Sequence, residues 1–286
     1  MIKNNIKMKL SIIIVHYKNK DKLIQCLDSI NNDKIEKEVI LIDNNSNDNI
    51  SEKLNKYDNI IYVKNKKNMG FAKACNQGIV KSTGKYILFL NPDTIIPKTT
   101  LEYCLDFYCK KQKIGFLGIK MLNSNGEFLK ESIRGIPDPF TAAMKIFKIN
   151  MLFSKSRIIN KYYLGNTDKE KNQKTEIVAG AFMMTSSEVM RKIKGFDEDF
   201  FLFGEDIDIS IRSLKQGYQN YYIAKKHIFH FKGESMKKNW KHIFHFYNSM
   251  IIFTKKHYSK ITLIVYPVVY LIMLLNYIKY FLFNKK

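Results

Sequence analysis

Short apolar runs bounded by polar residues recur along the first third of the chain and predict strands that are buried on both faces of a sheet. These runs are Leu10 to Val15, Val39 to Ile42, Ile60 to Val63 and Tyr86 to Leu90. Between them, apolar residues recur at helical spacing, first at Leu23, Leu27 and Ile30 and then at Ala72, Cys75 and Ile79. Because strands alternate with helices, we expect an α/β fold with a mostly parallel sheet and helices on both of its faces.

The pattern continues less regularly in the middle of the chain. It predicts a helix from Leu101 to about Lys111, one or two strands from Ile114 to Leu122, an apolar strand from Ile177 to Thr185 that contains Gly180, a helix from Ser186 to Lys194 and another helix up to Gly217. Either Ser186 or Ser187 is suited to cap the helix that stops at Gly195. Residues 123–175 contain Pro137, Pro139 and many Lys and Asn residues, which predicts loops.

Three of the predicted strands end in polar residues. The strand ends are His16-Tyr17, Asp43 to Ser46, and Asn91 to Asp93. In open α/β sheets the ligand crevice lies outside the carboxyl ends of the strands. The sequence therefore predicts one binding site to which all three strand ends contribute.

Two loops at this edge carry residues suited to bind a divalent cation or a phosphate. Pro92 cannot extend a strand ladder, so Asp93 is presented as a hard oxygen ligand for a divalent cation, although Asn-Pro-Asp is also an ordinary turn. Gly70 lies just before a helix that begins near Phe71, where a phosphate would be favoured by the positive end of the helix. A plain loop glycine is the alternative interpretation of Gly70.

Carboxylates are concentrated at the start of the last helix of this part, directly after an aromatic run. Glu205, Asp206 and Asp208 follow Gly204, and any of the three could act as a general base toward a hydroxyl. They could equally complement the helix dipole. His230 lies in an apolar stretch, where a lone histidine is usually packed or hydrogen-bonded.

Composition and charge narrow the class of protein. With 45% hydrophobic residues, the 286-residue chain can bury a core, which excludes general disorder. The net charge of +22 favours a polyanionic partner, such as a nucleic acid, an anionic membrane surface or a phosphorylated small molecule. The spacing of the four cysteines fits neither a zinc site nor a disulfide framework, so we interpret them as reduced thiols.

Half of the excess charge lies near the C-terminus, where residues 225–286 hold 12 Lys and one acid, Glu234. Lys237 to Lys256 has the pattern of an amphipathic helix, and Ile261 to Ile278 is an uncharged run of 18 residues interrupted by Pro267. We expect this tail to lie on an anionic membrane surface, ahead of a true span or a packed helix pair. The apolar run Ile12 to Val15 is too short for a signal peptide, so the catalytic part is expected in the cytoplasm.

Seven blocks occur in an order that resembles family 2 glycosyltransferases, especially the rhamnosyltransferase-like members that build bacterial surface polysaccharides. The blocks are Ser11 to Tyr17, Ile42 to Ser46, Asn68 to Gly78, Asn91 to Asp93, Gly180 to Met184, Gly195 to Asp208 and His230 to Ser235. The resemblance covers roughly Leu10 to Lys256, and seven ordered blocks make a chance match implausible.

The resemblance implies a glycosyltransferase A fold in residues 1–236, with a Rossmann-like nucleotide-binding half and a mixed central sheet, followed by a basic, membrane-associating helical extension in residues 237–286. It also implies an inverting transferase of the EC 2.4 class. Such an enzyme moves a sugar, here rhamnose or another hexose, from a nucleoside diphosphate donor to a hydroxyl of a cell-envelope glycan or a lipid-linked acceptor. A divalent cation, Mg²⁺ or Mn²⁺, is the implied cofactor.

The resemblance also assigns roles around the donor. Tyr17 and Asp43 match the residues that contact the nucleotide base and ribose, and Asn68 and Gly70 lie beside the nucleotide. Gly180 is similar to the residue that leaves room for the donor sugar.

The remaining assignments concern the cation and the proton. Asp93 matches the metal-binding acid of the family's Asp-x-Asp element, in which Asn91 replaces the first acid, so that only one carboxylate can ligate. His230 matches the late metal ligand. Asp206 matches the catalytic base, ahead of the neighbouring acids Glu205 and Asp208, which remain open as substitutes.

Two alternatives fit the same composition. A sugar-phosphate nucleotidyltransferase would keep the fold, but such enzymes usually have a Gly-rich loop after the first strand, and residues 16–19 contain no glycine. A nucleic-acid-binding protein would alternate aromatic residues with Lys on an exposed face. Here the aromatic residues cluster beside acids or in the apolar tail, so we expect no nucleic-acid partner.

Overall fold

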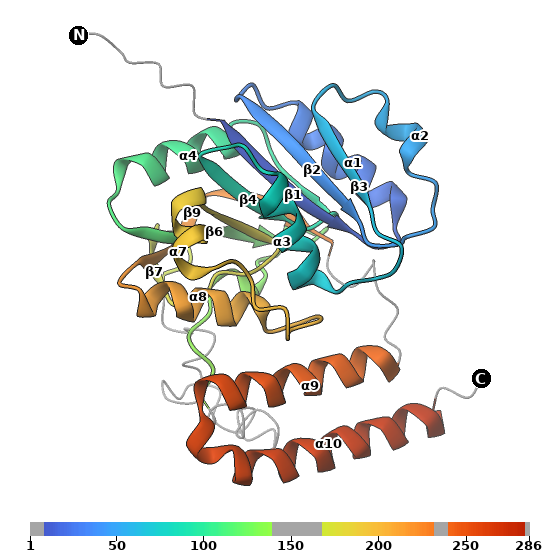
Figure 1. Cartoon of the computed structure of the whole chain (residues 1–286). Helices are drawn as coiled ribbons and strands as arrows, with labels where there is room; N and C mark the ends of the chain where they lie inside the picture. Colours follow the sequence, from blue (N-terminus) through green and yellow to red (C-terminus); the bar gives the residue numbers. More distant parts are fainter. Residues whose placement is uncertain (1–8, 139–167, 232–239, 284–286) are drawn as a thin grey trace.

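A mixed sheet with helices on both faces forms the larger part of the molecule (Figure 1). The computed structural model describes residues 9–138, 168–231 and 240–283. Within these ranges the strand order is β3-β2-β1-β4-β8-β6-β9-β5, and β7 also pairs with β9. The strands are β1 (Leu10–His16), β2 (Lys37–Asp43), β3 (Ile60–Lys64), β4 (Tyr86–Leu90), β5 (Thr94–Ile95), β6 (Ile114–Leu122), β7 (Gln173–Thr175), β8 (Phe182–Ser186) and β9 (Gln219–His230).

The helices agree closely with the spacing of apolar residues. They are α1 (Lys20–Asn31), α2 (Ser51–Leu54), α3 (Phe71–Lys81), α4 (Thr100–Lys110), α7 (Ser187–Ile193), α8 (Glu205–Lys215), α9 (Trp240–His257) and α10 (Thr262–Phe283), with 3₁₀ turns η1 (Lys130–Ser132) and η3 (Ser259–Ile261). Ser186, not Ser187, caps α7, because its hydroxyl accepts a hydrogen bond from the amide of Val189 at 3.2 Å.

The first half of the sheet is parallel, as predicted. β1 lies between β2 and β4, so that His16 is level with Asp43 and Ile14 is level with Leu90. The side chains of β1 alternate between two cores because successive residues of a strand point to opposite faces. Ile12 and Ile14 pack with α1 and α4, whereas Ile13 packs with α3 on the other face.

The second half departs from the expected mostly parallel sheet. β8 runs antiparallel to both β4 and β6, whereas β6 and β9 are parallel, so the sheet is mixed. β8 begins at Phe182 and not at Ile177, because the amide of Ile177 is bonded to the carbonyl of Arg134 outside the main ladder. Gly180 therefore lies in the turn before the strand, which corrects its predicted place within a strand.

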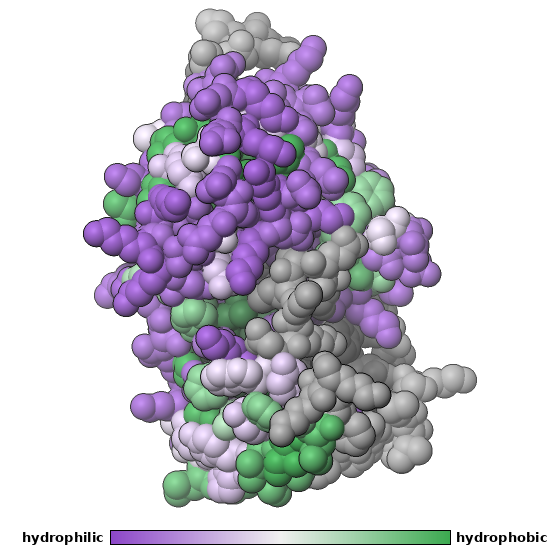
Figure 2. Space-filling view, turned by 90° about the vertical axis from the view of Figure 1, so that its right-hand side faces the viewer, coloured by the Kyte–Doolittle hydropathy of each residue, from purple (hydrophilic) through white to green (hydrophobic). Residues whose placement is uncertain are grey.

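The tail forms a helical hairpin, in which α10 packs back along α9 (Figure 1). Asn276 of α10 donates to the Tyr247 hydroxyl of α9 at 3.0 Å. Within the described ranges, residues 259–282 form the one helical stretch long and apolar enough to cross a membrane. Figure 2 shows apolar side chains gathered at this end of the molecule, apart from the hydrophilic surface of the sheet domain. The predicted boundary between residues 236 and 237 lies outside the described residues.

Candidate active site

The carboxyl ends of β1 and β2 meet, as the polar strand ends predicted. The amide of Asn44 donates to the carbonyl of His16 at 2.7 Å, and the amide of Lys18 donates to the Ser46 hydroxyl at 3.0 Å. Tyr17 lies on this edge with 37% of its surface exposed, so its ring is available to a planar ligand.

Asp43 lies beneath the same edge. Its side chain accepts hydrogen bonds from the amide of Ser46 and from the Tyr62 hydroxyl, each at 2.8 Å, and the residue is 2% exposed. Burial opposes ionisation of Asp43, but these hydrogen bonds outweigh it and hold the pKa of the carboxyl below its usual value. Asp43 thus stays ionised and fixes the loop after β2.

The loop before α3 is tied to the β2 end by side-chain amides. The Asn68 side-chain oxygen accepts from the amide of Gly70 and from the side chain of Asn44, each at 2.9 Å. The expected room for a ligand beside Gly70 is taken by Phe201, because a Cβ at Gly70 would lie 2.7 Å from the Phe201 carbonyl oxygen. The amide of Phe71, the first residue of α3, also donates to that carbonyl at 2.7 Å. Gly70, with φ of 83°, therefore permits packing of the loop that precedes α8.

Asp93 and His230 come together from segments more than a hundred residues apart. β5 pairs with the end of β9, which sets Thr94 opposite His230 and leaves the Asp93 Oδ1 at 3.4 Å from His230 Nε2. Both residues are buried, with 7% and 8% of their surfaces exposed. The sheet therefore brings together the two residues that the resemblance assigned to the metal.

This pair fits a divalent cation. A carboxylate and an imidazole are suitable ligands for Mn²⁺, and His230 Nδ1 has no hydrogen-bond partner among the described residues. In the same ranges no group of three His, Cys, Asp or Glu side chains is close enough to hold a metal. The remaining coordination positions would therefore fall to the ligand's phosphate oxygens and to water.

Asp206 stands in the first turn of α8, beside the turn that precedes β8. Its Oδ2 accepts a hydrogen bond from the amide of Gly180 at 3.1 Å and pairs with the guanidinium of Arg134 at 2.5 Å. A Cβ at Gly180 would lie 3.5 Å from the Asp206 Cβ, so the two backbones approach closely here. The amide of Asn91 in turn donates to the carbonyl of Ala181 at 3.1 Å. Two hydrogen bonds, Asn91 to Ala181 and Gly180 to Asp206, therefore connect the end of β4, which precedes Asp93, to Asp206 through the turn before β8.

The two neighbouring acids have different surroundings. Both oxygens of Asp208 are paired, with Arg212 at 2.7 Å and His257 at 2.9 Å, and the residue is 2% exposed, so it is poorly suited to meet a substrate. Burial, together with the charge of Asp206, raises the pKa of Glu205 to about 8. Glu205 is therefore largely protonated at neutral pH, and only a small fraction of it is in the form that can accept a proton.

Arg134 is a site residue that the sequence reasoning missed, because it lies in the loop-rich region. The composition could have pointed to Arg134, because Arg is rare in this chain: only four of the 48 cationic side chains are Arg. Two of these four, Arg134 and Arg212, pair with acids of α8. A rigid, permanently charged guanidinium suits a buried ion pair better than the flexible ammonium of Lys does.

Known proteins resemble this chain in sequence and in fold. The sequence pattern of the family described as "Glycosyl transferase family 2" matches residues 11–194. Rhamnosyltransferase WbbL of Escherichia coli K12 is 24% identical over 228 residues, which cover 77% of this chain and 82% of WbbL. An uncharacterised glycosyltransferase of Methanocaldococcus jannaschii, MJ1057, is 24% identical and covers 88% of this chain and 87% of its own.

Solved structures share the fold. Their similarity to this chain lies in the fold and much less in the sequence. GalNAc-T7, solved with UDP, GalNAc and Mn²⁺, superposes with a TM-score of 0.60 at 14% identity, over 87% of this chain and 48% of its own. The mannosyltransferase PcManGT of Pyrobaculum calidifontis, solved with GDP-Man and Mn²⁺, gives a TM-score of 0.56 at 14% identity, over 85% of this chain and 61% of its own. This chain thus spans less than two thirds of either solved chain. These likenesses show the glycosyltransferase A fold, and the match over residues 11–194 shows that the chain belongs to glycosyl transferase family 2.

Proposed function

We propose that this chain is an inverting transferase that moves a sugar, rhamnose or another hexose, from a nucleoside diphosphate to a hydroxyl of a cell-envelope glycan or a lipid-linked acceptor. One observation carries the proposal: the Asp93–His230 pair and Asp206 lie along one run of short contacts, which passes through the β4 end and the turn at Gly180. The near-full-length similarity to a rhamnosyltransferase supports the choice of sugar class.

The Asp93–His230 pair and Asp206 have different roles in the proposed reaction. Asp93 and His230 would hold Mg²⁺ or Mn²⁺, which neutralises the negative charge of the leaving diphosphate when bound. Asp206 takes the proton of the acceptor hydroxyl. Its Oδ2 is held by the Gly180 amide and Arg134, while no described residue donates to its Oδ1, so Oδ1 is the oxygen that accepts the proton. Attack from the face opposite the diphosphate, in one displacement, inverts the anomeric centre.

The donor's nucleotide is assigned to the β1 and β2 ends. The exposed ring of Tyr17 offers a surface on which the base can stack. Asp43, held ionised, orients the loop that faces the ribose. Asn68 and Gly70 shape the adjoining loop, and Asn91 and Gly180 border the position of the diphosphate and sugar.

A panel of nucleotide sugars tests this function. With Mn²⁺ present, we expect one donor to raise the melting temperature of the full-length chain and to release nucleoside diphosphate when an acceptor is added, because a ligand that binds only the folded state stabilises it. The matched control is the same panel with a chelator. A shift produced equally by sugar phosphates with nucleoside triphosphates, accompanied by pyrophosphate release, would instead indicate a nucleotidyltransferase.

We also propose that the α9–α10 hairpin attaches the chain peripherally to the inner face of the cell membrane. Several large apolar residues of α10 are exposed, among them Leu263 at 88% and Ile264 at 72%. Lysines flank the apolar stretch at Lys260 and Lys279, where they can contact anionic lipid. The partner of this surface is thus an anionic lipid membrane.

Replacing Leu271, Leu274, Leu275 and Leu282 of α10 together with Gln should release the chain from anionic vesicles in a flotation assay. All four are more than half exposed. Each leucine side chain that can no longer be buried in lipid lowers the membrane affinity by roughly 1.5–3 kcal/mol. Val80, an exposed apolar residue of α3, provides the control, since Val80→Gln should leave flotation unchanged. Flotation of the fourfold variant with the parent's efficiency would refute attachment through α10.

A further inference from the structure

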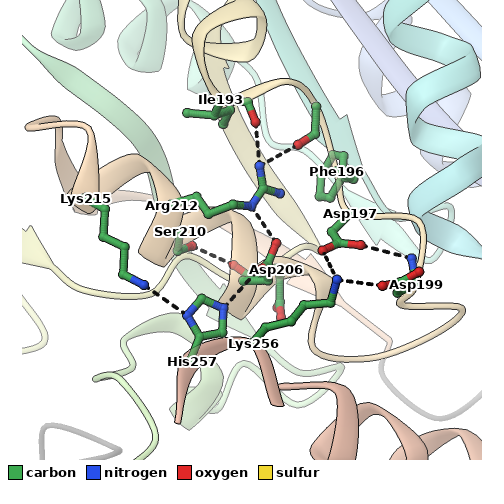
Figure 3. A network of polar contacts seen from close by, with 12 residues as sticks. Ile193, Phe196, Asp197, Asp199, Asp206, Ser210, Arg212, Lys215, Lys256 and His257 are labelled. Atoms are coloured by element: carbon green, nitrogen blue, oxygen red, sulfur yellow. Dashed lines mark hydrogen bonds and ion pairs between the residues drawn. The ribbon is translucent and has the colours of Figure 1, made fainter. Parts of the chain in front are cut away.

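The last turn of α9 is bound to the helix that carries Asp206 (Figure 3). His257 Nε2 lies 2.9 Å from Asp208 Oδ1, and both side chains are buried. His257 belongs to the tail, whereas Asp208 is two residues beyond Asp206 on α8. The tail therefore contacts the helix that carries Asp206.

Asp208 connects α8 both to the tail, through His257, and to the segment after α7, through Arg212. Its Oδ2 accepts from Arg212 Nε at 2.7 Å, and Arg212 Nη1 donates to the carbonyls of Ile193 at 2.6 Å and Gly195 at 2.9 Å. Burial opposes ionisation of Asp208, but the hydrogen bonds from His257 and Arg212 outweigh it and lower the pKa of the carboxyl. Asp208 is thus a buried, ionised group whose position depends on His257 and Arg212.

The residues on either side of His257 contact the segments that flank Asp206. Lys256 Nζ bridges Asp197 at 2.7 Å and Asp199 at 2.6 Å, in the loop that leads to α8. The Tyr258 hydroxyl donates to the carbonyl of Pro137 at 3.1 Å, three residues beyond Arg134. Residues 256–258, which we call the tail clamp, thus touch α8, the loop before it and the segment that carries the cationic partner of Asp206.

The start of α8 needs such external support. Phe203 and Gly204, which precede the helix, have φ values of 71° and 82°. A bulky residue in the left-handed region is strained and persists only when surrounding contacts hold it. The ring of Phe203 packs on His242 and Phe246 of α9, which provides part of that support.

We propose that the tail clamp positions Asp206 for catalysis, and that His257 is its principal positioning residue. This inference rests on the proposed role of Asp206 as the base. It gives the tail a second task, because transfer to a soluble acceptor then depends on residues 256–258 even where no membrane is present. His257 acts through Asp208 and α8 and touches neither donor nor acceptor.

The test compares full-length His257→Ala and His257→Gln with the parent, using a soluble acceptor. We expect kcat to fall about 10- to 100-fold in His257→Ala, because a misplaced catalytic group loses rate of this order. The KM for the donor should stay within about twofold, since His257 contacts Asp208, Lys215 and Phe253 and none of the residues assigned to the nucleotide. His257→Gln, which can donate an amide hydrogen to Asp208, should recover most of the rate, and both variants should float with vesicles as the parent does.

Lys255→Ala is the matched control, because Lys255 is an exposed cation in the same turn. It should retain the parent's kcat. A folded His257→Ala with the parent's kcat would overturn the inference, and so would equal losses in the Ala and Gln variants that simply follow a fall in melting temperature. Asp206→Asn measured alongside separates the two claims: if it stays fully active, the assignment of the base fails and the inference fails with it, whereas an inactive Asp206→Asn together with a fully active His257→Ala overturns the clamp alone.

Discussion

Asp206→Asn is expected to lower the rate of sugar transfer by about 10²- to 10⁴-fold, the range that general bases contribute. The amide has nearly the shape of the carboxylate and its oxygen can still accept from the Gly180 amide, so the fold and donor binding should persist. What the variant loses is the oxygen that takes up the acceptor's proton. The measurement is single-turnover transfer from the donor identified in the nucleotide-sugar panel.

Glu205→Gln is the matched control for this loss. Because burial and the charge of Asp206 raise the pKa of Glu205, its carboxyl already carries a proton over most of the neutral range, and Gln reproduces its charge. We expect Glu205→Gln to stay within about tenfold of the parent, a difference of 1.36 kcal/mol in the barrier. The reverse ranking, with Asp206→Asn active and Glu205→Gln inactive, would assign the base to Glu205.

Asp93→Ala should abolish the dependence of donor affinity on Mn²⁺. In the parent, calorimetry with Mn²⁺ should give a donor Kd at least tenfold lower than with a chelator, which corresponds to about 1.4 kcal/mol. In the variant the two values should converge, because His230 alone is too weak a protein ligand for the cation. Asn91→Asp supplies the opposite change, since a second carboxylate at the end of β4 should tighten the binding of Mn²⁺.

The outcome that would contradict the metal assignment is specific. If the parent binds the donor equally well with Mn²⁺ and with a chelator, no cation is held by Asp93 and His230. A parent that depends on Mn²⁺ together with an Asp93→Ala variant that depends on it equally would move the cation to other ligands.

The parts of the fold that follow local pattern were predictable from the sequence. The four apolar runs became β1 to β4, and the polar ends of β1 and β2 meet through the Asn44–His16 and Lys18–Ser46 hydrogen bonds. The direction of β8 was not predictable, because apolar periodicity is the same for parallel and antiparallel strands. β8 pairs with β4 between residues as distant in the sequence as Leu90 and Phe182, and the local sequence does not encode such a pairing.

The candidate site shows the same division. Asp93 and His230 could be suspected from their blocks, but only the β5–β9 pairing brings them within 3.4 Å. The crowding of Gly70 by Phe201 depends on a contact across more than a hundred residues, so the expectation of open space there had no local evidence against it.

The tail was predicted as an amphipathic surface helix, and α9 has the expected bounds to within a few residues. Its binding to α8 through His257 was not predicted. Histidine and lysine on such a helix suit anionic lipid and a buried carboxylate equally well, and the sequence alone does not distinguish these two partners.

In the proposed mechanism, a cation at Asp93 and His230 and a base at Asp206 face one donor from opposite sides. The most direct measurement is a crystal structure with Mn²⁺ and the nucleoside diphosphate, in which anomalous scattering locates the metal. We expect a manganese peak within bonding distance of an Asp93 carboxylate oxygen and a His230 ring nitrogen, with the diphosphate on the metal and Asp206 Oδ1 open toward the sugar position. A peak bound elsewhere, with the nucleotide in a cleft that Asp206 does not border, would contradict it.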